Sequence, residues 1–187
     1  MKVYDMLYSL ILIFNLFGPM GDFTFDFGKE KDGQEWRIVN DGVMGGLSRG
    51  KIEFTKNSLV FSVTVSLENN GGFTSFRAPY AQYDLSEYDK VEIKYRSEGM
   101  DCALSFDQNS RFWRPNHKMP IPATKNDWIT LEANLYELSE YQMGRMTGGQ
   151  MSESDARRTI RLGLITDSKK AGSFSLEIDY IRFYKSK

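Results

Sequence analysis

Apolar and polar side chains alternate along most of the chain after residue 22, which is the two-residue period of β-strands. Residues 23–27 place three phenylalanines on one face, and residues 58–66 align four apolar side chains in the same way. The alternation recurs in residues 35–39, 88–96, 102–106, 128–133, 160–165 and 174–184. Only residues 152–156 favour a helical turn, with a serine in the capping position. The pattern therefore predicts an all-β fold, an antiparallel β-sandwich.

Residues 66–77 contain the run Asn-Asn-Gly-Gly, whose residue types tolerate the left-handed backbone conformation of tight turns. We interpret this segment as a hairpin connection followed by an alternating strand. Asn70, Ser75 and Arg77 would then lie near the hairpin. Arg77 could anchor a carboxylate or a loop carbonyl there.

A second glycine-rich segment, residues 39–48, carries three glycines within five residues next to a predicted strand. Such glycines permit positive φ angles and close backbone approach. The spacing is not the dinucleotide fingerprint, and no Lys-Ser/Thr pair follows as in a P-loop. No helical pattern follows that could hold a phosphate at its N-terminus. These features argue against nucleotide binding.

The N-terminus combines Lys2, an apolar stretch over residues 6–17 and the breaker Gly18-Pro19, which resembles a signal peptide. We expect residues 1–21 to be a signal peptide or an N-terminal apolar segment, and residues 22–187 to be a single β-sandwich domain. The expected location is periplasmic or extracellular. The alternative is a cytoplasmic protein whose N-terminal segment packs on the sandwich. Membrane contact is expected only through this segment, if it is not cleaved.

Composition narrows the classes of function. The 24 basic and 25 acidic residues nearly cancel, so no electrostatic reason exists to expect a nucleic-acid partner. Cys102 is the only cysteine and His117 the only histidine, which excludes an internal disulfide and the usual zinc, Cys-His and Ser-His-Asp sites within one chain. We expect Cys102 to be a small buried residue. The chain is therefore not expected to be an enzyme.

Trp36 with residues 39–48, and residues 67–77, resemble two ordered signatures of the complex I intermediate-associated protein 30 family. Further similarity follows at residues 144–145, 160–167 and 171–181, so the resemblance spans residues 23–184. It identifies these candidate binding-loop residues: Trp36, Asn40, Asp41, Gly42, Met44, Gly45, Gly46, Ser48, Asn69, Asn70, Gly71, Gly72, Phe73, Ser75 and Arg77.

The resemblance implies a jelly roll of the galactose-binding domain-like type, without a cofactor. It also implies a non-catalytic binding module, because mitochondrial members act as chaperones in respiratory complex I assembly. A protein partner is then expected, with Met44 and Phe73 as apolar anchors. The alternative is a carbohydrate-binding module of an exported protein, with Trp113 as a stacking platform.

Two weaker alternatives concern acidic residues. Glu177 and Asp179 lie two positions apart on a predicted strand and so share a face, which makes them a candidate carboxylate pair for a hydrolase. Glycosidase carboxylates, however, flank their substrate from opposing positions, so a solvated or turn-capping pair is the simpler interpretation. Asp26, Glu177 and Asp179 are also the candidates for a structural calcium ion.

Overall fold

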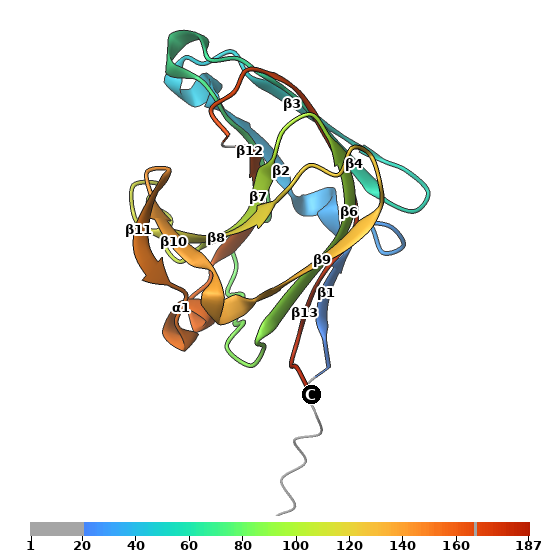
Figure 1. Ribbon diagram of the computed structural model, residues 1–187, viewed down its shortest axis with the longest axis vertical. Helices are drawn as coiled ribbons and strands as arrows, with labels where there is room; N and C mark the ends of the chain where they lie inside the picture. Colours follow the sequence, from blue (N-terminus) through green and yellow to red (C-terminus); the bar gives the residue numbers. More distant parts are fainter. Residues whose placement is uncertain (1–20, 167) are drawn as a thin grey trace, which may run out of the picture.

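The computed structural model describes residues 21–166 and 168–187, which form two antiparallel β-sheets packed face to face (Figure 1). The six-stranded sheet runs in the order β3-β4-β13-β6-β9, and β1 pairs with β13 beside this path. Its strands are β1 (Phe23–Asp26), β3 (Arg49–Phe54), β4 (Leu59–Val65), β6 (Lys90–Glu98), β9 (Ile129–Asn134) and β13 (Gly172–Tyr184). The long β13 organises this sheet because it pairs with β4, β6 and β1.

The seven-stranded sheet runs in the order β11-β10-β8-β7-β12-β5-β2. Its strands are β2 (Arg37–Asn40), β5 (Thr74–Arg77), β7 (Cys102–Asp107), β8 (Asn116–Ile121), β10 (Ser139–Gln142), β11 (Arg145–Gln150) and β12 (Arg161–Thr166). In Figure 1 this sheet bends from β11 through β8 and β7 up to β12, with its outer face on the inner side of the bend. Neighbouring strands far apart in sequence give a jelly roll, so the predicted fold class is confirmed.

The core between the sheets is built from the apolar side of each alternating strand. Trp36 is 2% exposed and packs edge-on against Phe25 and Phe27, with ring centroids 5.3 and 5.2 Å away. Its ring also lies 5.2 Å from that of Phe76, so the aromatic cluster joins the two sheets. The N-terminal strand β1 is thus held by side-chain packing as well as by pairing.

Short helices occupy the connections: η1 (Asp32–Glu35), η2 (Asp41–Met44), η3 (Glu68–Asn70), η4 (Leu135–Glu137) and α1 (Glu153–Arg157). The predicted helical turn is confirmed as α1, and Ser152 forms a capping box with Asp155. In residues 21–166 and 168–187, no helix has the length and apolarity needed to cross a membrane.

The interpretation of residues 66–77 as a hairpin connection is wrong. β4 belongs to the six-stranded sheet and β5 to the seven-stranded sheet, so this segment crosses between the sheets. The expected left-handed backbone conformation is confirmed, because Asn69, Asn70 and Gly72 have φ angles of 53°, 61° and 134°. Left-handed residues mark a sharp change of direction, but they do not determine which strand follows.

Four strands were not expected from the sequence: β3, β8, β10 and β11. β8 contains Pro120, which is unfavourable in a central strand. β10 pairs with β8 only at residues 116–118, so Pro120 lies where the strand has a partner on one side alone. The predicted export segment, residues 1–21, lies outside the described residues except for Gly21.

Candidate functional site

Asp41 joins the two glycine-rich segments. Its side chain is fully buried, and its Oδ1 accepts a hydrogen bond from Ser48 N at 3.0 Å. Its Oδ2 accepts bonds from Ser48 Oγ at 2.5 Å and from the N–H groups of Gly72 at 2.7 Å and Phe73 at 3.3 Å. Burial alone would raise the pKa of Asp41, but these donors outweigh it and hold the pKa below its usual value. The charged carboxylate therefore holds the two segments together. We call Asp41 and its hydrogen-bond donors Ser48, Gly72 and Phe73 the clasp.

Two glycines are required by this clasp. A Cβ on Gly46 would lie 2.4 Å from Asp41 Cγ, and one on Gly71 would lie 2.6 Å from Asp41 Oδ2. Gly42, in contrast, has open space around it. Gly45 ends η2 with a φ angle of 89°, a conformation that favours glycine. The motif thus has a local structural cause, which is close packing around a buried carboxylate.

The remaining predicted loop residues are divided among different environments. Trp36 lies in the core, Asn40 and Phe73 are partly buried, and Asn69 and Asn70 are exposed. The proposed apolar anchor Met44 lies outside the described side chains. Ser75 and Arg77 do not join the clasp, because β5 carries them onto the outer face of the seven-stranded sheet.

This outer face has small residues in its middle. Gly163 pairs with Ser105 on one side and Arg77 on the other, and the neighbouring row contains Ser75 and Ala103 on either side of Ile165. Ser75, Ala103 and Ser105 are at most 6% exposed. Larger polar or aromatic side chains surround this floor: Arg77, Tyr80, Asp107, Asn116, Lys118, Tyr141 and Arg161. We call these surrounding residues with the small floor residues the outer face.

A hydrogen-bonded network crosses one end of the outer face. Arg161 donates to Asp107 Oδ2 from Nε at 2.9 Å and Nη2 at 2.8 Å, and both side chains are nearly buried. Asn116 Nδ2 donates to Asp107 Oδ1 at 3.0 Å, so both carboxylate oxygens are occupied. The Arg161 guanidinium lies 4.3 Å from the ring centroid of Tyr80, which remains 54% exposed. The network fixes an exposed aromatic ring beside a polar floor.

Arg77 lies across this floor. A Cβ on Gly163 would lie 3.0 Å from Arg77 Cγ, so the glycine makes room for the arginine stem. Arg77 Nε donates to Ser75 Oγ at 2.7 Å, and Ser75 Oγ donates to the Val39 carbonyl at 3.2 Å. Burial and the positive charge of Arg161 lower the pKa of Arg77, whereas Asp107 raises it. The guanidinium is thus positioned by its stem and its Nε.

An apolar patch adjoins the outer face where the β7–β8 loop lies beside the β10–β11 hairpin. It comprises Phe112, Trp113, Met143 and Met146, which are 67%, 49%, 60% and 62% exposed. Phe112 and Trp113 pack edge to face, and Gln142 Nε2 donates to the Trp113 carbonyl at 3.2 Å. The hydrogen bond ties the loop carrying the two rings to the β10–β11 hairpin that carries the two methionines. We call these four residues the hairpin patch.

The acidic candidates are engaged in other interactions. Glu177 is bonded to Arg96 and Ser58, Asp179 pairs with Lys94 at 2.8 Å, and Asp26 Oδ1 accepts from Lys29 N at 2.7 Å. Among the described residues, no group of three or more His, Cys, Asp or Glu side chains could hold a metal ion. The carboxylates proposed for calcium or for hydrolysis therefore serve as hydrogen-bond acceptors in turns and ion pairs.

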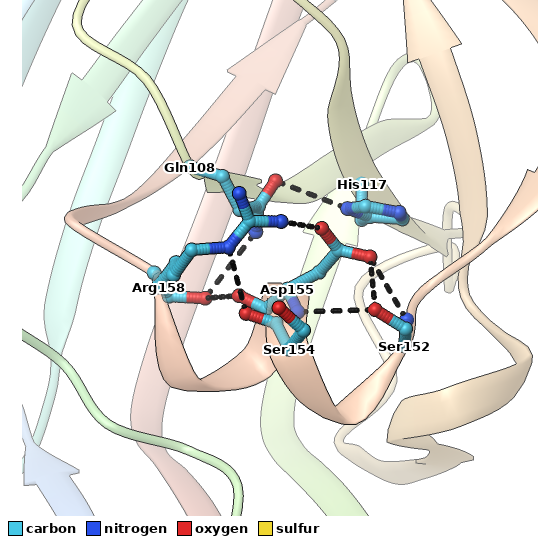
Figure 2. Close-up of polar contacts among 7 residues, drawn as sticks. Gln108, His117, Ser152, Ser154, Asp155 and Arg158 are labelled. Carbon is cyan, nitrogen blue, oxygen red and sulfur yellow. Dashed lines mark hydrogen bonds and ion pairs between the residues drawn. The ribbon is translucent and has the colours of Figure 1, made fainter.

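His117 is buried beneath α1, and Cys102 is buried in the core. Figure 2 shows the histidine beside Gln108, whose Oε1 lies 3.0 Å from His117 Nδ1. Gln108 Nε2 donates to Thr159 Oγ1, which donates to the Asp155 carbonyl. Burial lowers the pKa of His117, opposed by the charges of Asp155 and Glu140 and by the Gln150 carbonyl. The cluster supports the packing of α1 against the sheet.

Two hollows lie elsewhere on the surface. One of about 690 Å³ lies on the outside of the six-stranded sheet, beside Arg49, Lys51, Ser62 and Glu98. The other, of about 480 Å³, lies between the strands β9 and β8, beside Lys90, Lys118 and Glu132. Neither contains an exposed aromatic ring, so neither offers the combination of ring and polar floor found on the outer face.

Sequence reasoning did not find Arg161, Asp107 or Tyr80. Asp107 and Arg161 lie 54 positions apart, and only the pairing of β7 with β12 brings them together. The available signal was alternation, because Arg161 precedes Leu162 and Leu164 and must therefore face away from the core.

The family model described as Complex I intermediate-associated protein 30 matches residues 25–178. No curated protein matches the sequence. Among solved structures, the chain resembles the family 11 carbohydrate-binding module of the Clostridium thermocellum cellulase Lic26A-Cel5E. The TM-score is 0.64 at 17% identity, covering 90% of this chain and 97% of the module.

A second structure of the Clostridium thermocellum module, in complex with a β-1,3-1,4-mixed-linked tetrasaccharide, gives a TM-score of 0.63 at 16% identity. It covers 90% of this chain and 98% of the other. The agarase AgWH50C gives 0.60 at 12% identity, covering 90% of this chain but 25% of the agarase. At these identities the likeness concerns the fold.

Proposed function

Because this chain belongs to the Complex I intermediate-associated protein 30 family and has the fold of a carbohydrate-binding module, we propose that it is a non-catalytic binding module. Its ligand lies on the outer face of the seven-stranded sheet. The observation that carries this proposal is a floor of small residues flanked by the aromatic rings of Tyr80 and Tyr141.

The ligand class that fits this surface is a polysaccharide chain. Sugar rings stack on aromatic side chains, and hydroxyl groups bond to fixed polar groups such as the Asn116 amide. A protein interface core, in contrast, is depleted in charged residues. The tetrasaccharide complex of the similar family 11 module supports the same ligand class.

Affinity electrophoresis through gels containing a panel of plant, algal and bacterial polysaccharides tests this proposal. At least one polymer should retard the wild type, and Tyr80→Ala and Tyr141→Ala should weaken that retardation. Trp128→Ala is the matched control, because Trp128 is 41% exposed but lies beside Lys94 and Arg96 of the six-stranded sheet. Retardation by no polymer, or equal weakening by the control, would contradict the proposal.

A protein partner is the second candidate, and the hairpin patch is the observation that favours it. Four large apolar side chains clustered on the surface are typical of a protein contact. A stoichiometric partner captured from the native host should be lost with the double variant Met143→Ser/Met146→Ser and kept with Tyr80→Ala. The opposite pattern would remove this candidate.

Export is part of the same proposal, because extracellular or periplasmic polysaccharide requires a translocated domain. The signal-like composition of residues 1–21 supports it. N-terminal sequencing of the protein from its native host should show a mature chain that begins near Gly21 or Asp22. An intact N-terminus on protein recovered from the cytoplasm would contradict export.

A further inference from the structure

Arg77 has a positive charge that no ion pair compensates within residues 21–166 and 168–187. Its hydrogen bond is made by Nε to the neutral Ser75 hydroxyl. The Nη groups are the part of the guanidinium that usually forms bidentate pairs with an anion. Because Ser75 and the stem over Gly163 already fix the side chain, an incoming anion would meet a pre-positioned partner.

Asp107 does not hydrogen-bond to Arg77. Its oxygens accept from Arg161 and Asn116, and Arg161 itself repels Arg77. Two adjacent guanidinium groups with one carboxylate leave a local excess of positive charge. An anion at Arg77 would relieve that repulsion.

The excess extends along the outer side of the seven-stranded sheet to β2. Arg37, Arg77 and Arg161 point outward on β2, β5 and β12 by register, whereas Asp107 is the one acid at the outward strand positions of the described residues. The full sequence carries a net charge of -1, so the positive field belongs to this surface and not to the protein as a whole. Tyr80 supplies a stacking ring beside it.

We propose that the ligand is an anionic polysaccharide whose carboxylate or sulfate group pairs with Arg77 while a neighbouring sugar ring lies against Tyr80. This rests on the proposed glycan-binding function and adds the charge class of the ligand. Asp107 and Arg161 position Tyr80 and limit the space around the anion.

The test measures binding of the full chain to polygalacturonate and to the same polymer after chemical reduction of its carboxyl groups, which is a neutral galactan. Carrageenan and agarose provide a sulfated and a largely unsulfated pair. The protein should bind at least one anionic polymer with an affinity about ten-fold higher, or more, than its affinity for the neutral counterpart, as expected for a charge-assisted pair. The member that binds identifies the anionic group.

Arg77→Met keeps the stem and removes the charge, and should lower affinity for the anionic polymer to that for the neutral one. Lys51→Met removes one positive charge from an exposed residue of the six-stranded sheet, away from the outer face, and should change affinity by about two-fold or less. Both variants should keep the melting temperature of the wild type, so that a change in affinity reflects the lost charge and not a loss of folded protein.

Equal affinity for anionic and neutral polymers would overturn the anionic assignment and leave glycan binding standing. Failure to bind any polysaccharide would overturn both proposals. Binding to polyglutamate with no binding to acidic polysaccharide would also overturn both, in favour of an acidic protein partner.

Discussion

The carboxylate of Asp41 accepts a 2.7 Å hydrogen bond from the backbone N–H of Gly72, which lies 31 residues further along the chain. This contact connects η2, which follows a strand of the seven-stranded sheet, to the crossover that leaves the six-stranded sheet. The two most distinctive segments of the sequence are therefore one structural unit. Ligand binding is assigned to a different surface, the outer face of the seven-stranded sheet.

Replacing Asp41 by alanine should lower the free energy of unfolding by about 3 kcal/mol or more, because buried donors of Ser48, Gly72 and Phe73 lose a charged acceptor. Denaturant unfolding measures this effect. Glu53→Ala, at an exposed position without a hydrogen bond or ion pair among the described residues, should cost about 0.5 kcal/mol or less. Similar costs for the two variants would contradict the clasp.

The acid sensitivity of the clasp follows from the lowered pKa of Asp41. The unfolded chain binds a proton near pH 3.8, whereas the folded carboxylate resists protonation to lower pH. Its contribution is therefore complete above about pH 3.8 and is lost as the pH falls through the folded pKa. Asp41→Asn should lose this part of the acid dependence. An unchanged slope of stability against pH below 3.8 would contradict the assignment.

The glycines around the clasp should differ in tolerance. Gly46→Ala and Gly71→Ala place a methyl group against the Asp41 carboxylate and should each cost about 1–3 kcal/mol. Gly42→Ala, which meets open space, should leave the melting temperature nearly unchanged. Thermal unfolding of the three variants separates a structural role from a ligand-contacting role, because only the former predicts this order.

Stability should also depend on pH through His117. Burial lowers its folded-state pKa, so the unfolded chain takes up the proton more readily. Stability should therefore fall as the pH drops below the unfolded value, about 6.5, until the folded pKa is reached. His117→Gln should flatten the pH dependence of stability below about pH 6.5. A variant with the same dependence would show that other groups cause it.

Gly163→Ala tests how the floor supports Arg77. The added methyl group would lie 3.0 Å from Arg77 Cγ and 3.3 Å from Ser105 Oγ, which displaces the arginine stem. We expect the affinity for the best-bound polysaccharide to fall about three-fold or more, with a stability cost of about 1 kcal/mol or less. Full retention of affinity would show that the position of this stem is not needed.

Much of the fold could be predicted from alternation. Residues 58–66, 88–96 and 174–184 have a clear apolar face and form the centre of the six-stranded sheet. β10 and β11 could not be predicted in the same way, because their side chains lie at a sheet edge and bury little apolar surface. The sequence pattern also could not predict to which sheet β5 belongs, since a turn signal does not identify the strand with which the next segment pairs.

The candidate site, like the fold, could be predicted from the sequence only in part. The pattern around Asp41 marked residues that the structure brings together, but it gave no reason to separate a clasp from a binding loop. Arg77 was recognised as an anchor for an anion, yet its neighbours Arg161 and Tyr80 come from other parts of the chain. Long-range strand pairing creates the outer face, and local spacing does not reveal it.

The most direct test of the account is an amide chemical-shift map of the isotope-labelled protein titrated with the polysaccharide fragment that binds best, starting with a tetrasaccharide of galacturonic acid. The account predicts that the largest shifts fall on β5, β7, β8 and β12, around Arg77, Ser105 and Gly163. Shifts concentrated at residues 41–48 and 66–73, or on the outside of the six-stranded sheet, would contradict it.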